Sequence, residues 1–166
     1  MKATYQKILL SEGSSFLTTR LILPRFHSEY HFHPEYELKY VIESKGKRFV
    51  GDTIENFQGG DLILLGPNIP HYWKNDAIHD QSDLMQAKAI VVLFAEDFLG
   101  DKFFSVQEMI PIMDLLRKSN AGLAFPNAID GPIPRMMEEL TKSAGPLRII
   151  LMLGILAELE KAESRK

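Results

Sequence analysis

The chain has 166 residues, of which 45% are hydrophobic and 25% charged, the ordinary balance of one globular domain with a single core. A net charge of -3 excludes the basic field that holds a nucleic-acid backbone, and the lack of cysteine excludes disulfides, thiolate catalysis and cysteine-ligated zinc. No apolar run is long enough for a secretory signal or for the roughly 20 residues of a membrane span, so we expect a soluble, cytoplasmic protein.

Short strands separated by turn signals are predicted throughout residues 1–100. The expected strands are 16–23, 36–44, 48–50, 53–57, 62–65, 71–74 and 86–94. Lys45-Gly46-Lys47 is the expected turn before the third strand, and Gly51-Asp52 is a two-residue hairpin signal. Several short strands at regular spacing predict a β-sandwich or a β-barrel.

Residues 101–166 change to a helical period. Apolar side chains from Val106 to Leu116 follow one helical face, with a kink or restart expected at Pro111, and a second helix is expected from Ile133 to Leu140. Pro146 opens a third helix that is apolar nearly all round over residues 147–159. We expect this tail to pack on the barrel as one structural unit and to bury its remaining apolar surface against a second copy, giving a homodimer.

The residues that indicate chemistry are His31, His33, Glu37 and His71. Residues two apart in a strand face the same side, so His31 and His33 can aim two imidazoles at one point, with Glu37 in phase if the strand continues past Pro34. Two or three histidines with one carboxylate are a sensible ligand set for divalent zinc, iron, manganese or nickel. The alternative is a metal-free cluster of hydrogen-bonded polar residues at the mouth of a barrel.

Trp73 is the aromatic residue that we place in a ligand pocket, because it shares strand parity with His71. Tyr36, Leu38 and Tyr40 also alternate together, and this pattern is typical of core packing. Three cationic side chains could bind an anionic group of a ligand, but a surface or ion-pair role is expected for each of them. These residues are Arg20, Arg25 and Lys39.

Two spaced motifs resemble those of the cupin family. The pattern His31-x-His33-x3-Glu37 followed by Gly46 is similar to the first cupin motif, and Gly60-x5-Gly66-Pro67-x3-His71-x3-Asn75 is similar to the second. The resemblance implies a double-stranded β-helix, or jelly-roll, barrel. It also implies that the three histidines and Glu37 are metal ligands, although many regulator cupins hold no metal.

A closer resemblance, covering nearly the whole chain, is to the N-terminal sensing domain of AraC-family transcriptional regulators. It rests on several separated blocks in order: residues 31–38, 49–54, 60–71 and 92–99, followed by the helical tail. The family resemblance implies a cupin domain that binds a small effector, often a sugar, and helices that form a dimer. It also implies that DNA is bound by a C-terminal pair of helix-turn-helix motifs, which we expect to lie outside this chain.

Three functions follow from these patterns. The first is ligand sensing and dimerisation, with His31, His33, Glu37, His71 and Trp73 at the cavity and no catalytic residue. The second is a metal-dependent cupin enzyme of the oxygenase or isomerase type, although no acid or base beyond the candidate ligands is evident. The third is a barrel that dimerises and binds nothing.

Overall fold

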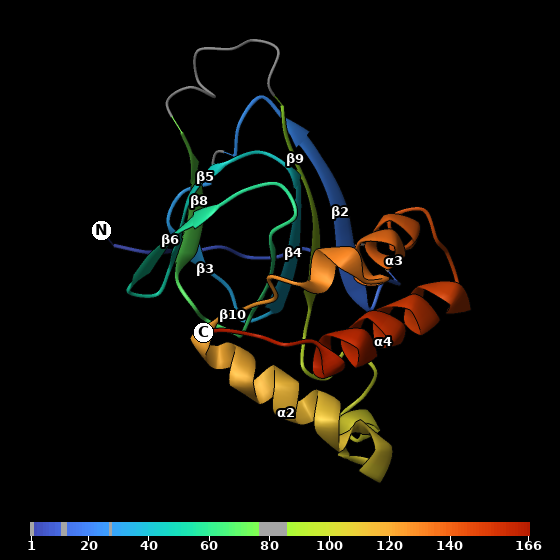
Figure 1. Ribbon diagram of the computed structural model, residues 1–166. Helices are drawn as coiled ribbons and strands as arrows, with labels where there is room; N and C mark the ends of the chain where they lie inside the picture. Colours follow the sequence, from blue (N-terminus) through green and yellow to red (C-terminus); the bar gives the residue numbers. More distant parts are fainter. Residues whose placement is uncertain (1, 11–12, 27, 77–85) are drawn as a thin grey trace.

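The computed structural model describes residues 2–10, 13–26, 28–76 and 86–166, which form two facing β-sheets with helices behind one of them (Figure 1). Among these residues the first sheet has the strand order β1-β3-β8-β5-β6 and the second has the order β10-β7-β4-β9-β2. The strands are β1 Thr4–Tyr5, β2 Phe16–Leu23, β3 His31–Phe32, β4 Tyr36–Glu43, β5 Gly46–Val50, β6 Thr53–Phe57, β7 Leu62–Leu65, β8 His71–Asn75, β9 Ala87–Phe94 and β10 Leu123–Ala124. The predicted fold class, a jelly-roll barrel followed by helices, is confirmed.

The helical part follows the last long strand of the barrel. Its elements are η1 Phe103–Ser105, η2 Gln107–Met109, α2 Ile110–Lys118, η3 Ser119–Ala121, η4 Ala128–Asp130, α3 Ile133–Leu140 and α4 Pro146–Lys161. The helical stretch expected from residue 106, with a kink or restart at Pro111, takes the form of the short helix η2 followed by α2, which begins at Ile110. Pro111 has no N–H to donate and therefore fits the first helical turn, which places the helix start just before it. None of the described helices is long and apolar enough to cross a membrane.

Strand β4 shows how one alternating sequence serves two environments. It lies between β7 and β9 in the second sheet. Tyr36 and Leu38 are buried in the core shared with the helices, whereas Glu37 and Lys39 line a cavity between the sheets. The odd and even positions of one strand therefore supply the core and the site, as period-two alternation requires.

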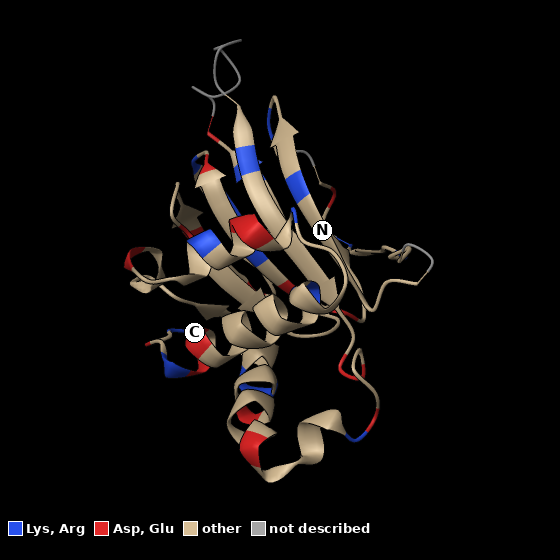
Figure 2. Cartoon of the chain, turned by 90° about the vertical axis from the view of Figure 1, so that its right-hand side faces the viewer, with Lys and Arg blue, Asp and Glu red and all other residues tan. Residues whose placement is uncertain are grey.

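The helices cover the outer face of the second sheet (Figures 1 and 2). Leu156 and Ile155 of α4 are fully buried in the same core as Leu38 and Val92 of the sheet. An ion pair joins Arg20 on β2 to Glu138 on α3, as expected for a surface cation. Because apolar contacts extend from the sheet through all three α-helices, the helical part and the second sheet share one core.

The last residues of the chain join the second sheet through a single bridge. Ala124 donates its N–H to the carbonyl of Arg165 at 2.8 Å, and Arg165 donates back to Ala124 at 2.9 Å. Ala124 is in register with Ile63 of β7, which is in register with Lys39 of β4. A continuous row of paired residues thus runs from the cavity wall to Arg165.

Gly46 corrects the expected turn at residues 45–47, because it is the first residue of β5 rather than part of a turn. A Cβ atom at this position would lie 2.1 Å from the carbonyl oxygen of Lys74 on β8, which leaves no room for a side chain.

We therefore expect Gly46→Ala to destabilise the domain by about 1 to 3 kcal/mol in urea unfolding, the usual cost of overpacking. The control is Gly131→Ala, whose Cβ would meet only the Ala128 carbonyl at 3.4 Å. Equal stability of the two variants would contradict the packing argument.

Candidate metal and ligand site in the barrel

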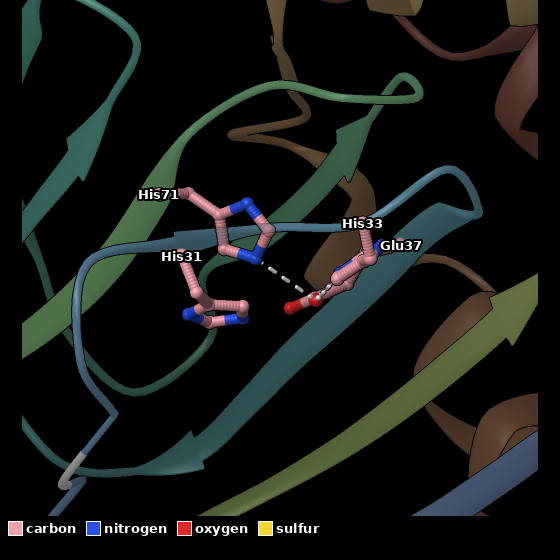
Figure 3. A group of neighbouring side chains, drawn as sticks. All are labelled: His31, His33, Glu37 and His71. Atoms are coloured by element: carbon pink, nitrogen blue, oxygen red, sulfur yellow. Dashed lines mark hydrogen bonds and ion pairs between the residues drawn. The ribbon is translucent and has the colours of Figure 1, made fainter. Parts of the chain in front are cut away.

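The four predicted ligands come together inside the barrel (Figure 3). His31 lies on β3, opposite His71 at the start of β8. His33 lies just beyond β3, and the turn at Pro34 leads into β4, which carries Glu37. The bend at Pro34 therefore places His33 and Glu37 on two segments that face each other, rather than on one continuous strand.

The donor atoms of these side chains are close enough to share one ion. One ligand atom from each of the four lies within 4.8 Å of the others. His33 Nε2 and His71 Nε2 each lie 3.2 Å from Glu37 Oε2. His33, Glu37 and His71 are buried, and His31 is partly exposed at the cavity. This is a compact set of three imidazoles and one carboxylate on a rigid barrel.

Backbone carbonyls fix the tautomer of all three imidazoles. Nδ1 of His31 is 2.7 Å from the Glu29 carbonyl, Nδ1 of His33 is 3.1 Å from the Glu35 carbonyl, and Nδ1 of His71 is 2.7 Å from the Ile69 carbonyl. A carbonyl oxygen can only accept, so each Nδ1 carries the proton and donates it. In the neutral rings each Nε2 therefore keeps its lone pair, and Figure 3 shows the His71 ring directed at Glu37. Metal-binding histidines in proteins are typically oriented in this way.

The charges of the site favour a cation at its centre. Burial on its own lowers the pKa of His33, but the hydrogen bond and charge of Glu37 raise it above the ordinary value. Burial would raise the pKa of Glu37, but His71, His33 and Lys39 hold it well below its usual range. Either the imidazoles take a second proton to hydrogen-bond Glu37, or a metal ion occupies the position between the lone pairs and the carboxylate.

Three members of the cluster, His31, His33 and Glu37, line a cavity of about 210 Å³ between the two sheets, and the fourth, His71, contacts this wall through Glu37. Trp73 lies in the wall, as its strand parity predicts. The N-terminal arm contributes Gln6 and Ile8, which follow β1 where it pairs in parallel with β3. The remaining lining residues are Thr19, Leu21, Ser28, Lys39, Val91 and Leu93. The cavity therefore combines a polar end with apolar walls, which is typical of small-molecule sites.

Lys39 is the functional candidate that the sequence placed at the surface. Its side chain is 6% exposed and lines the cavity, and its ammonium lies 3.5 Å from the ring centre of Trp73. Burial lowers the pKa of Lys39 to about 8, so the side chain is still mostly protonated at pH 7. The signal available in the sequence was its parity with Glu37, two positions earlier on the same strand.

Comparisons with known proteins find a matching ligand-binding family and solved structures with a similar fold. Residues 14–84 match the family model of the AraC-like ligand binding domain. The structure resembles ToxT from Vibrio cholerae O395 bound to (E)-4-(8-methylnaphthalen-1-yl)but-3-enoic acid, with a TM-score of 0.53 and 14% identity. A second ToxT structure, from Vibrio cholerae, gives a TM-score of 0.51 at 14% identity, and each alignment covers 89% of this chain and 57% of ToxT.

A cupin 2 conserved barrel domain protein from Salinispora arenicola CNS-205 is also similar, at 18% identity over 57% of this chain and 76% of that protein, with a TM-score of 0.43. No curated protein sequence matches the chain significantly. The chain spans little more than half the length of ToxT. Residues 14–84 therefore resemble the AraC-like ligand binding domain, and the two facing sheets fit a cupin-type barrel.

Proposed function

We propose that this chain is the effector-sensing and dimerisation domain of an AraC-like transcriptional regulator, with a small molecule bound in the barrel. The observation that carries the proposal is the cavity, which is lined by His31, His33 and Glu37 of the cluster together with Lys39 and Trp73. All five residues lie inside the segment matched by a ligand-binding family. DNA binding belongs in this proposal to a part of the regulator outside this chain. ToxT, which shares the fold, has been solved with a small organic acid, and this supports testing small molecules here.

A divalent metal is the second part of the proposal, with His31, His33, Glu37 and His71 as its ligands. The three available Nε2 lone pairs and one carboxylate oxygen suit zinc, iron, manganese or nickel. A bound ion would replace the second protons on the imidazoles and offer an electrophilic contact for oxygen atoms of an effector. Trp73 and Lys39 would then contact other parts of that molecule.

The N-terminal arm is the element that we expect to respond to the effector. Gln6 and Ile8 line the cavity, and Gln6 donates its backbone N–H to the carbonyl of Phe32 at 2.9 Å. An effector that contacts Gln6 and Ile8 favours the docked arm over the released one, and such differential binding is what a ligand switch requires.

The test of the sensing function is direct binding to the purified domain. Trp73 is the chain's only tryptophan, so quenching of its fluorescence reports the cavity. We expect at least one sugar or small organic acid from a panel to change this fluorescence and raise the melting temperature, and His71→Ala to weaken both effects. A flat response to all sugars and acids in both assays would reject the proposal.

Dimerisation through α4 is expected because this helix keeps apolar side chains at the surface. Ile150 is 64% exposed and Leu147 is 44% exposed, one turn apart on the same helix. Light scattering should give twice the 18.9 kDa chain mass for the wild type and a monomer for Ile150→Glu. Ile54→Glu is the matched control, because Ile54 is 60% exposed on β6 of the other sheet, and it should remain dimeric. A wild-type monomer at high concentration would refute the dimer.

The second candidate function is a metal-dependent enzyme of the oxygenase or isomerase type, which the four-ligand cluster favours. Among the described residues that line the cavity, Lys39 is the one titratable side chain outside that cluster. Catalysis would therefore depend on the metal and Lys39. Two results together would favour the enzyme over the sensor. The metal-loaded protein would turn over a substrate, and His31→Ala would abolish this turnover.

A further inference from the structure

The feature that the proposed function leaves unexplained is the environment of Lys39. Its side chain is 6% exposed and leaves the inner face of β4 into the cavity. The ammonium lies over two aromatic rings, 3.5 Å from the centre of Trp73 and 4.7 Å from that of Phe26. It makes no hydrogen bond or ion pair with any residue in the part of the chain that the structure describes.

The groups that the structure describes around Lys39 leave its ammonium without a directly paired carboxylate. Across the second sheet, β9 presents Val91 and β2 presents Thr19, in register with Lys39. The carboxylate among the described cavity residues is Glu37, which is already engaged by His33 and His71. A buried ammonium without an ion-pair partner is costly, and contacts with aromatic faces recover only part of that cost.

We infer that Lys39 is the counter-charge for the carboxylate of a small organic acid, which makes such an acid the effector class of the cavity. This inference rests on the proposed sensing function and narrows its ligand from any small molecule to an anion. The effector would place its carboxylate against the ammonium, and its carbon chain against the apolar walls made by Leu21, Val91 and Leu93.

The cavity has room for a small acid. A volume of about 210 Å³ holds roughly seven water-sized groups, which is enough for an acid with a similar number of heavy atoms. Lys39 and Glu37 are two residues apart on β4, a separation of about 7 Å along a strand. A chain of about three to five carbon atoms is therefore long enough to extend from Lys39 to the histidine cluster.

The first measurement compares ligand-free variants, so it does not depend on finding the natural effector. Lys39→Met keeps the length of the side chain and removes its charge, and we expect it to raise the melting temperature by about 2 to 8 °C. Lys47→Met makes the same exchange at an exposed position of β5 and should leave the melting temperature nearly unchanged. A fall in melting temperature for Lys39→Met alone would show that the cation stabilises the fold and would overturn the inference.

The second measurement uses matched probes. Propanoate, butanoate and 2-oxobutanoate are titrated beside propanamide and butanamide, with melting temperature and Trp73 fluorescence as readouts. We expect at least one acid to bind at least tenfold more tightly than the amides, Lys39→Met to lose this preference, and Lys39→Arg to retain it. Acids and amides that bind equally, or acids that bind Lys39→Met as well as wild type, would overturn the inference.

L-arabinose and D-glucose, titrated in the same assays, separate the two possible failures. If a sugar binds wild type and Lys39→Met equally and no acid binds, the sensing function stands and the carboxylate class is wrong. If neither sugars nor acids bind the wild type, the sensing function and the inference are rejected together.

Discussion

Zn²⁺ at about one hundred times its Kd is expected to raise the melting temperature of the domain by about 5 to 11 °C. The value follows from linkage, since a ligand that binds only the folded state at that excess contributes about 2.7 kcal/mol. One kcal/mol corresponds to about 2 to 4 °C in a domain of this size. The structural reason is the preformed set of His31, His33, Glu37 and His71, whose ligand atoms lie within 4.8 Å of one another. Zinc is the appropriate probe because it accepts imidazole and carboxylate ligands and has no redox chemistry.

Variants of the four-residue cluster test whether the zinc-induced rise in melting temperature comes from binding at this cluster. His31→Ala combined with His71→Ala, and separately Glu37→Gln, should abolish the zinc-induced shift. Glu35→Gln is the control, because the Glu35 carboxylate lies on the Nδ1 side of His33, 3.6 Å away and outside the four-residue set. A shift of unchanged size in the double variant would show that zinc binds elsewhere.

Lowering the pH should reduce the rise in melting temperature that zinc causes. A metal requires the unprotonated Nε2 of each histidine, and the pKa of His33 in the metal-free protein is raised because Glu37 outweighs the effect of burial. As pH falls through that value, protons occupy the site and compete with zinc. The zinc-induced shift should therefore be smaller at pH 5.5 than at pH 7.5.

Leu156→Ala is expected to cost about 2 to 5 kcal/mol of unfolding free energy, the usual range for a large-to-small change in a packed core. Leu156 is fully buried on α4 and belongs to the core that joins the helices to the second sheet. Urea unfolding should show a lower midpoint with an unchanged slope.

Ile110→Ala provides the comparison within the helical part. Ile110 is 40% exposed at the start of α2, so its truncation removes fewer contacts and should cost less than about 1 kcal/mol. A cost for Leu156→Ala as small as that for Ile110→Ala would mean that α4 is not firmly packed on the barrel.

The sequence predicts the barrel and the candidate ligands well because both depend on short, repeated spacings. Alternation along β4 separates Leu38 from Glu37, and the His-x-His pair with its later histidine indicates one site. Strand parity also places Trp73 at the cavity. These features are local, so the linear sequence contains them.

Features that depend on closure of the barrel could not be predicted in the same way. A lysine in a strand is normally taken as exposed, and Lys39 is buried only because Phe26 and Trp73 are brought over it from other segments. Gly46 looks like a turn residue until β8 passes within 2.1 Å of where its Cβ would be. Both depend on neighbours that are distant in sequence, which a turn signal or a polarity pattern does not show.

At the bridge between Ala124 and Arg165 we expect the free energy of local opening to be low. Two backbone hydrogen bonds to Ala124 and an ion pair to Glu55 at 3.9 Å hold Arg165, whereas the strands that carry Lys39 and Ile63 belong to a ladder buried under the helices. Segments held by few bonds open more often than the centre of a sheet, so the amides of Ala124 and Arg165 should exchange with solvent through small fluctuations. We therefore expect the row of paired residues that begins at the cavity wall to open first at its outer end, at Arg165, while the barrel remains folded.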